Sequence, residues 1–183
     1  MTLIICPGIH DVALSDRFLN ALNRQLQATG SNCQILPEQV LPTQRHMPFD
    51  GLAVWSFVEE RADPPAPLLL IGFSAGVVGA IAAANLWQAQ GRTVAAAIAV
   101  DGWGVPQIGD FPLHRVSHDH FTHWSSALLG AGQDSFYADP PVEHLDLWGF
   151  PEGALGVRVS PSGPPKQMTA IAFIAALIDR YRS

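Results

Sequence analysis

The stretch Leu68-Leu69-Leu70-Ile71-Gly72-Phe73-Ser74-Ala75-Gly76 joins the most strand-like segment of the chain to an alanine-rich one. Its first six residues are apolar or glycine, which predicts a strand buried on both faces. Residues 75–90 are rich in alanine and stop before Gly91, which predicts a helix ended by glycine. A serine at such a tight strand-to-helix turn, flanked by small residues, projects its hydroxyl clear of the backbone. Ser74 is therefore the candidate nucleophile.

Strand and helix patterns alternate on both sides of this turn. Short apolar runs predict strands at residues 3–6, 33–36, Leu68–Phe73, Val94–Val100, Leu113–Ser117 and 136–138. Apolar residues at helical spacing predict helices at Val12–Ala28, 49–61, 75–90 and 168–181. The rhythm predicts one α/β domain over residues 1–183, with a mostly parallel sheet of about six strands and helices on both faces. A histidine-rich loop is expected after Ser117, and a surface loop or small flap at residues 149–165, which are rich in Gly and Pro.

The composition excludes several classes of protein. Of 183 residues, 48% are hydrophobic and 14% charged, which is enough apolar material for a buried sheet. The net charge is −6 and Lys166 is the only lysine, so no nucleic-acid footprint is present. No apolar run approaches the roughly 20 residues needed to span a membrane, and the first residues lack the positive charge of a signal peptide. Cys6 and Cys33 form neither a disulfide framework nor a metal motif, which predicts a reducing, cytoplasmic location.

The pentapeptide Gly72-Phe73-Ser74-Ala75-Gly76, set between a strand and a helix, resembles the nucleophile elbow of the α/β-hydrolase superfamily. The chain is most similar to the small, lidless members of that family. The resemblance implies that the first strands of the larger enzymes are missing and that there is no cap domain. It also implies the chain order serine, then acid, then histidine.

The family order selects the acid and the base. His144 fits the histidine because it follows the last expected strand, as the family's histidine does. Asp119 is the first choice of acid, since it ends the strand from Leu113 and the family's usual acid occupies that loop. Asp101, at the end of the preceding strand, is the alternative that some relatives use. If Asp101 is the acid, three more histidines become permissible bases: His118, His120 and His123.

Two backbone N–H groups are needed for an oxyanion hole. Ala75 follows the nucleophile and supplies one. The second is expected from the loop after the first strand, with Ile9 as the donor. Family members commonly have His-Gly in this loop; Pro7 departs from that pattern, whereas Gly8 keeps the close backbone approach.

The remaining signals are weaker. Four histidines crowd residues 114–123, but no acidic or cysteine cluster completes a metal site there, so no metal is predicted. No glycine-rich phosphate loop occurs, so no cofactor is predicted. Trp103, Trp124 and Trp148 follow expected strands and either line a pocket or pack helices on the sheet.

These patterns predict a serine hydrolase that cleaves a carboxylic ester or thioester through an acyl-Ser74 intermediate. Its expected partner is a small-molecule acyl substrate, without nucleic acid, and the sequence leaves its oligomeric state open. The alternative is a catalytically inactive α/β-hydrolase-like binding protein that keeps the pocket but not the triad geometry.

Overall fold

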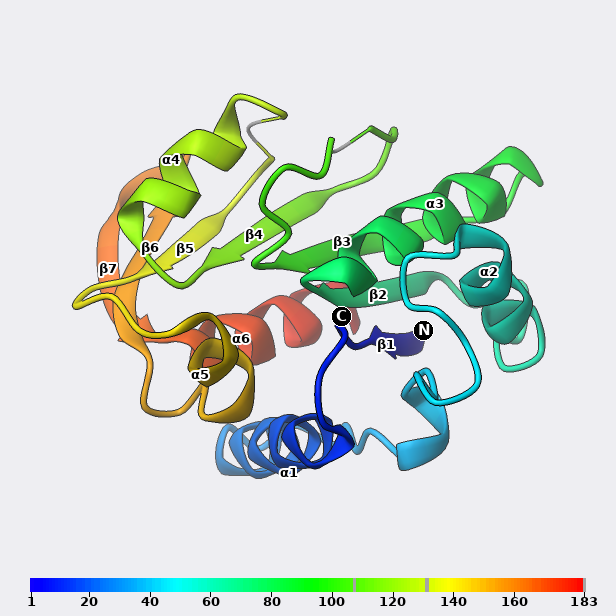
Figure 1. Cartoon of the computed structure of the whole chain (residues 1–183), viewed down its shortest axis with the longest axis horizontal. Helices are drawn as coiled ribbons and strands as arrows, with labels where there is room; N and C mark the ends of the chain where they lie inside the picture. Colours follow the sequence, from blue (N-terminus) through cyan, green and yellow to red (C-terminus); the bar gives the residue numbers. More distant parts are fainter. Residues whose placement is uncertain (107, 131, 183) are drawn as a thin grey trace.

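A seven-stranded sheet in the order β1-β2-β3-β4-β5-β6-β7 forms the centre of the computed structural model, which describes residues 1–106, 108–130 and 132–182 (Figure 1). The strands are β1 (Thr2–Cys6), β2 (Leu68–Phe73), β3 (Val94–Val100), β4 (Leu113–Ser117), β5 (Ser135–Ala138), β6 (Leu155–Ser160) and β7 (Gly163–Thr169). The α-helices are α1 (Val12–Ala28), α2 (Gly51–Glu59), α3 (Ala75–Ala89), α4 (His120–Ala127), α5 (His144–Gly149) and α6 (Ala170–Arg182). The predicted α/β class is confirmed.

Strands β1 to β5 run parallel, and β6 and β7 complete the sheet as an antiparallel hairpin. All six residues of β2 are buried, as their unbroken apolar run predicts for a central parallel strand. Because the first five strands are parallel, the loops that leave their carboxyl ends meet at one edge of the sheet. That edge carries Ser74, Asp101, His118 and His144.

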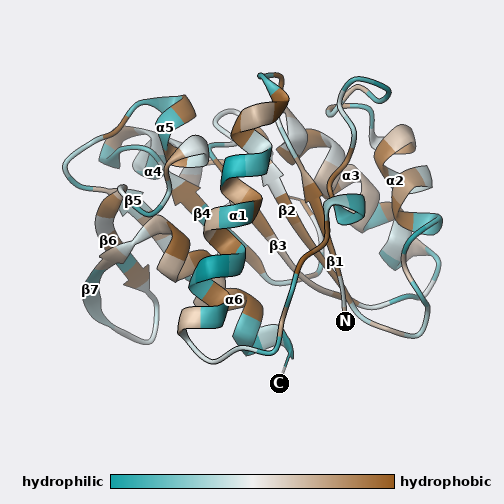
Figure 2. Cartoon of the chain, turned by 90° about the horizontal axis from the view of Figure 1, so that it is seen from below, coloured by the Kyte–Doolittle hydropathy of each residue, from teal (hydrophilic) through white to brown (hydrophobic). Residues whose placement is uncertain are grey.

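Helices cover both faces of the sheet. Helices α1, α5 and α6 lie on one face, and α2, α3 and α4 on the other (Figure 1). Viewed from below, α1 and α6 cross in front of the strands (Figure 2). The larger core lies under α1 and α6, where Phe18, Phe73 and Trp148 are fully buried. A second core packs α2 and α3 against the alternate side chains of β1 and β2. None of the described helices combines the length and the apolarity needed to cross a membrane.

Three sequence predictions are wrong. Residues 33–36 form no strand, because the Asn23 side chain bonds both the N–H and the C=O of Ile35 and takes the place of a neighbouring strand. The histidine-rich loop is instead helix α4, whose N-cap is Asp119. Residues 149–165 hold the end of α5, β6 and the start of β7. Prolines are tolerated in β7 because it pairs with β6 alone and lies at the edge of the sheet.

Candidate active site

Ser74 occupies a strained turn between β2 and α3. Its φ of 51° and ψ of −122° lie outside the regions that most residues adopt. The glycines on either side are required by space: a Cβ on Gly72 would lie 2.7 Å from Val77 Cα, and one on Gly76 would collide with the Cys6 carbonyl. The turn therefore brings the start of α3 against the end of β1, and the need for small residues on both sides of the serine is as the sequence motif predicts.

Asp101 lies at the end of the neighbouring strand β3 and is only 5% exposed. It is, after Ser74, the other described non-glycine residue with a positive φ, also 51°. Its Oδ1 accepts the backbone N–H of His118 at 2.9 Å. Its Oδ2 lies 2.7 Å from Nδ1 of His118 and 2.7 Å from Nδ1 of His144. One buried carboxylate is thus shared by two imidazoles.

Asp119, the first choice of acid, lies elsewhere in the site. Its Oδ1 accepts the Thr122 N–H at 2.6 Å and caps α4. Its Oδ2 is 3.8 Å from Nε2 of His118, and His144 pairs with Asp101 instead. The expectation that His144 faces Asp119 is therefore wrong in its geometry. The physical reason is the helix that follows β4, which uses the Asp119 carboxylate to satisfy its own first turn.

The hydrogen bonds fix the imidazole tautomers. A carboxylate accepts but does not donate, so both His118 and His144 carry a proton on Nδ1. Burial acts to raise the pKa of Asp101, but the hydrogen bonds from the two histidines outweigh it and hold this pKa below its ordinary value. The bond to Asp101 also raises the pKa of His118, and the charges of Asp119 and Glu143 add to that effect. In the neutral form of either imidazole, Nε2 is the nitrogen that can accept a proton.

The loop after β1 lies against the nucleophile. A Cβ on Gly8 would stand 3.0 Å from Ser74 Cβ, so no larger residue fits there without a shift. The Ala75 N–H opens α3 and has no acceptor within its own helix. In the described part of the chain, neither the Ala75 nor the Ile9 N–H donates a backbone hydrogen bond outside the regular elements. Neither predicted oxyanion donor therefore has a backbone acceptor within the described residues.

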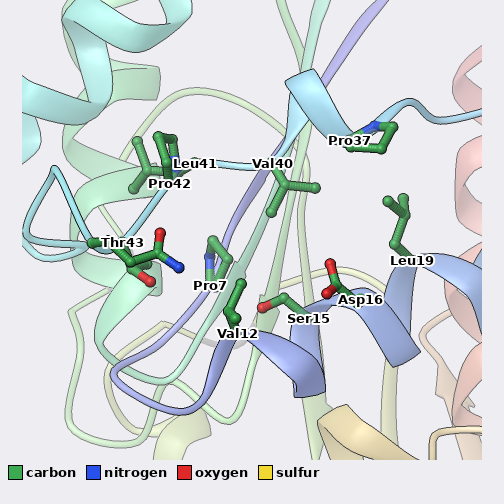
Figure 3. Close-up of a pocket in the computed structure, with 11 residues that line it drawn as sticks. Pro7, Val12, Ser15, Asp16, Leu19, Pro37, Val40, Leu41, Pro42 and Thr43 are labelled. Atoms are coloured by element: carbon green, nitrogen blue, oxygen red, sulfur yellow. The ribbon is translucent and has the colours of Figure 1, made fainter.

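A cavity of about 480 Å³ opens over Ser74. Its lining residues are Ser74, Asp101, Trp103, His118, Phe121, Thr122 and His144. Asp101, His118 and His144 also bring their ligand atoms within 4.8 Å of one another, close enough for a metal ion to be shared. A smaller cavity of about 160 Å³ lies between α1 and residues 37–44, where Asp16 and Ser15 face mainly apolar side chains (Figure 3). Ser74 does not line that smaller cavity.

The other aromatic and histidine candidates lie in different places, some at the cavity and some in the core. Trp103 lines the cavity over Ser74, whereas Trp148 is fully buried and stacks on Phe73 with ring centroids 4.8 Å apart. His114 lies in the core, with Nδ1 3.0 Å from the Asp134 carbonyl and Nε2 2.8 Å from the Tyr181 hydroxyl. The crowded histidines therefore do not form one centre.

Two contributors to the site had no clear sequence signal. The sequence indicates His118 only as an optional base and not as a partner of Asp101, and it predicts a loop at Phe121. An amphipathic pattern at Phe121, Trp124 and Leu128 could have indicated α4. No protein-family model and no curated protein matches the chain.

Proposed function

We propose that this chain is a serine hydrolase of the α/β-hydrolase type that cleaves a carboxylic ester or thioester. One observation carries the proposal: the strained Ser74 shares a cavity with His144, whose Nδ1 is held by the buried Asp101 carboxylate. Nucleophile, base and orienting acid come from the carboxyl ends of three parallel strands, in the order that such a triad requires. The triad proposed is Ser74, Asp101 and His144.

In the first step, Ser74 Oγ attacks the carbonyl carbon and gives its proton to His144 Nε2. The Ala75 and Ile9 N–H groups stabilise the oxyanion that forms. The tetrahedral intermediate collapses, and the leaving alcohol or thiol takes the proton from His144. A water molecule then attacks the acyl-serine in the same way, which releases the acid and restores the Ser74 hydroxyl.

The surroundings of the Nε2 atoms favour His144 over His118 as the base. Nε2 of His118 lies beside the Asp119 carboxylate, and three acidic neighbours raise its pKa. Because that nitrogen is directed toward a second carboxylate, His118 is less suited than His144 to take the serine proton. Its side chain and backbone N–H instead hold Asp101 in place. His144→Asn should therefore reduce turnover far more than His118→Asn.

One observation favours the second candidate, a binding protein without catalytic activity. Within the described residues, the Ser74 hydroxyl makes no hydrogen bond to His144 or His118, although it shares their cavity. Such bonds are often long in unliganded enzymes and tighten when substrate binds. The distinction therefore requires a chemical test.

A fluorophosphonate probe supplies that test. An activated serine attacks the phosphorus and becomes covalently labelled, so we expect one label per chain, located at Ser74 by mass spectrometry. The matched control is Ser74→Ala, which removes one oxygen from a residue that faces the cavity. Labelling that persists in this variant, or none in the wild type, would reject the proposed nucleophile.

The location proposed for this hydrolase is the cytoplasm. Cys6 and Cys33 are both free thiols, as in a reducing compartment. Burial raises the pKa of the Cys6 thiol to about 12, so this cysteine stays protonated and inert.

A further inference from the structure

Helix α4 is oriented with its polar side toward the protein. Thr122 and Ser126 are each 6% exposed and face the sheet, one turn apart. On the opposite side, Phe121, Trp124 and Leu128 are between 56% and 74% exposed. Surface helices of globular proteins ordinarily bury the apolar stripe and expose the polar one. The exposed apolar stripe on α4 is therefore a feature that needs a ligand or a partner to explain it.

This stripe begins at the cavity over Ser74. Phe121 and Trp103 both line the cavity, and the Trp103 Nε1–H donates to Ser125 Oγ at 3.1 Å, which ties the loop after β3 to α4. The rings of Phe121 and Trp124 have centroids 6.2 Å apart. Leu128 continues the line at helical spacing. At a rise of about 1.5 Å per residue, the stripe extends roughly 10 Å away from the cavity.

The two segments that carry the stripe contribute no Asp, Glu, Lys or Arg side chain to it. Residues 102–109 and 120–133 contain no Asp, Glu, Lys or Arg in the sequence. The charged and titratable groups that line the cavity itself, Asp101, His118 and His144, belong to the catalytic centre. The stripe therefore suits an uncharged, apolar chain whose reactive end lies at Ser74.

We propose that the stripe Trp103-Phe121-Trp124-Leu128, the acyl shelf, binds the aliphatic acyl chain of the substrate, so that the hydrolase prefers medium-chain esters. The inference rests on the proposed function, and it specifies the substrate class of the same site. The reach from Phe121 to Leu128 corresponds to about eight carbons of an extended chain. Because the shelf is open, each methylene is half-buried and should raise kcat/KM about twofold, against roughly fourfold for full burial.

The test compares p-nitrophenyl esters from acetate to decanoate, each below its aggregation limit. In the wild-type protein, kcat/KM should rise from acetate to about decanoate, because the carbons that cross the cavity from Ser74 precede those that lie along the shelf. Phe121→Ser should flatten the rise from butyrate onward, because Phe121 is next to the cavity. Leu128→Ser should flatten only its last part, because Leu128 is reached by the longest chains alone. Leu52→Ser is the matched control, since Leu52 is 67% exposed on α2, and its profile should follow the wild type.

Several outcomes would overturn the acyl shelf while leaving the hydrolase intact. A flat profile in a protein with Ser74-dependent acetate hydrolysis is one. Equal losses at every chain length in both shelf variants would be another. A wild-type dimer that Leu128→Ser converts to a monomer, or cosedimentation of the wild type with phosphatidylcholine vesicles, would assign the stripe to a second copy or to a membrane.

A binding measurement separates failure of the shelf from failure of the hydrolase. Methyl decanoate titrated into the Ser74→Ala variant should change the tryptophan fluorescence saturably, because Trp103 and Trp124 lie on the shelf. Phe121→Ser combined with Ser74→Ala should weaken that binding at least fivefold. Binding that is absent, or unaffected by Phe121→Ser, would reject the shelf whatever the activity of Ser74.

Discussion

The two aspartates of the site differ in what they hold. Asp101 accepts hydrogen bonds from two imidazoles, whereas Asp119 caps a helix. We therefore expect Asp101→Asn to lower kcat by up to about ten-thousand-fold, because an amide neither fixes the His144 tautomer nor stabilises the imidazolium. Asp119→Asn should lower kcat less than about tenfold, since asparagine caps helices as well as aspartate does. Steady-state ester hydrolysis measures both effects. If Asp119→Asn loses activity and Asp101→Asn keeps it, the acid of the triad is Asp119, as the sequence predicts.

Arg115 is a second residue with an unusual environment. It is 2% exposed on β4, and none of its three guanidinium nitrogens has a hydrogen-bond partner within the described residues. Burial lowers the pKa of Arg115 to about 10, so the folded state disfavours the charged form. We expect Arg115→Met to raise the free energy of unfolding by about 1–3 kcal/mol, because it removes an uncompensated buried charge and keeps the apolar stem.

Urea unfolding at neutral pH tests this expectation. Arg92→Met is the control, since Arg92 pairs with Glu59 and its guanidinium lies 4.3 Å from the Trp87 ring centroid. That control should lose stability by about 1 kcal/mol or less. A loss for Arg115→Met would mean that the guanidinium has a stabilising partner in solution.

At the scale of single elements, the central strands β2 and β3 could be predicted from sequence because burial on both faces leaves a continuous apolar run. The bounds of β2, β3 and β4 are those predicted. Helix α4 has helical spacing at Phe121, Trp124 and Leu128, but the same pattern assigns the wrong buried side, because its outward side is apolar and its inward side polar. Hairpin β6–β7 was missed because an edge strand tolerates the prolines that argue against a strand elsewhere.

The candidate site could be predicted from sequence only where it depends on a local motif or on chain order. Ser74 follows from a local motif in nine consecutive residues, and His144 from chain order. The choice of Asp101 over Asp119 depends on which carboxylate is nearer to His144 in space, and both end a strand at the same edge of the sheet. The spacing of residues in the sequence does not give the distance from His144 to either carboxylate. The choice between Asp101 and Asp119 therefore requires coordinates.

The turn between β2 and α3 offers a test at this scale. A Cβ on Gly76 would collide with the backbone carbonyls of Cys6 and Pro7, which cannot move without displacing β1. Gly76→Ala should therefore destabilise the fold by about 3 kcal/mol or more. Gly163→Ala is the matched control, because nothing lies within 4 Å of a Cβ at that position, and it should change stability by less than about 1 kcal/mol. Thermal unfolding followed by circular dichroism measures both, and equal effects would contradict the close packing of α3 on β1.

At the scale of the whole molecule, buried histidines should set the acid limit of stability. Burial lowers the pKa of His114 and of His123, because each would have to be charged inside the fold. A depressed histidine pKa contributes stability that is complete above the ordinary value near 6.5 and is lost as pH falls through the folded value. His118 acts in the opposite sense, because its raised pKa contributes stability that is lost as pH rises.

The contribution of His118 is already complete below pH 6.5, so the two histidines with lowered pKa set the sign there, and the free energy of unfolding should fall from pH 6.5 toward pH 5. The slope of each fully displaced group approaches about 1.4 kcal/mol per pH unit. His114→Gln removes one such group and can keep a hydrogen bond to Tyr181, so its slope in urea unfolding at pH 7, 6 and 5 should be shallower than that of the wild type. Parallel slopes for the two proteins would show that His114 does not take up a proton on unfolding in this range. The acid limit would then have to arise from carboxylates such as Asp134, whose pKa is held low by Ser160, Arg180 and Arg158 against the effect of burial, and whose contribution is lost only below about pH 4.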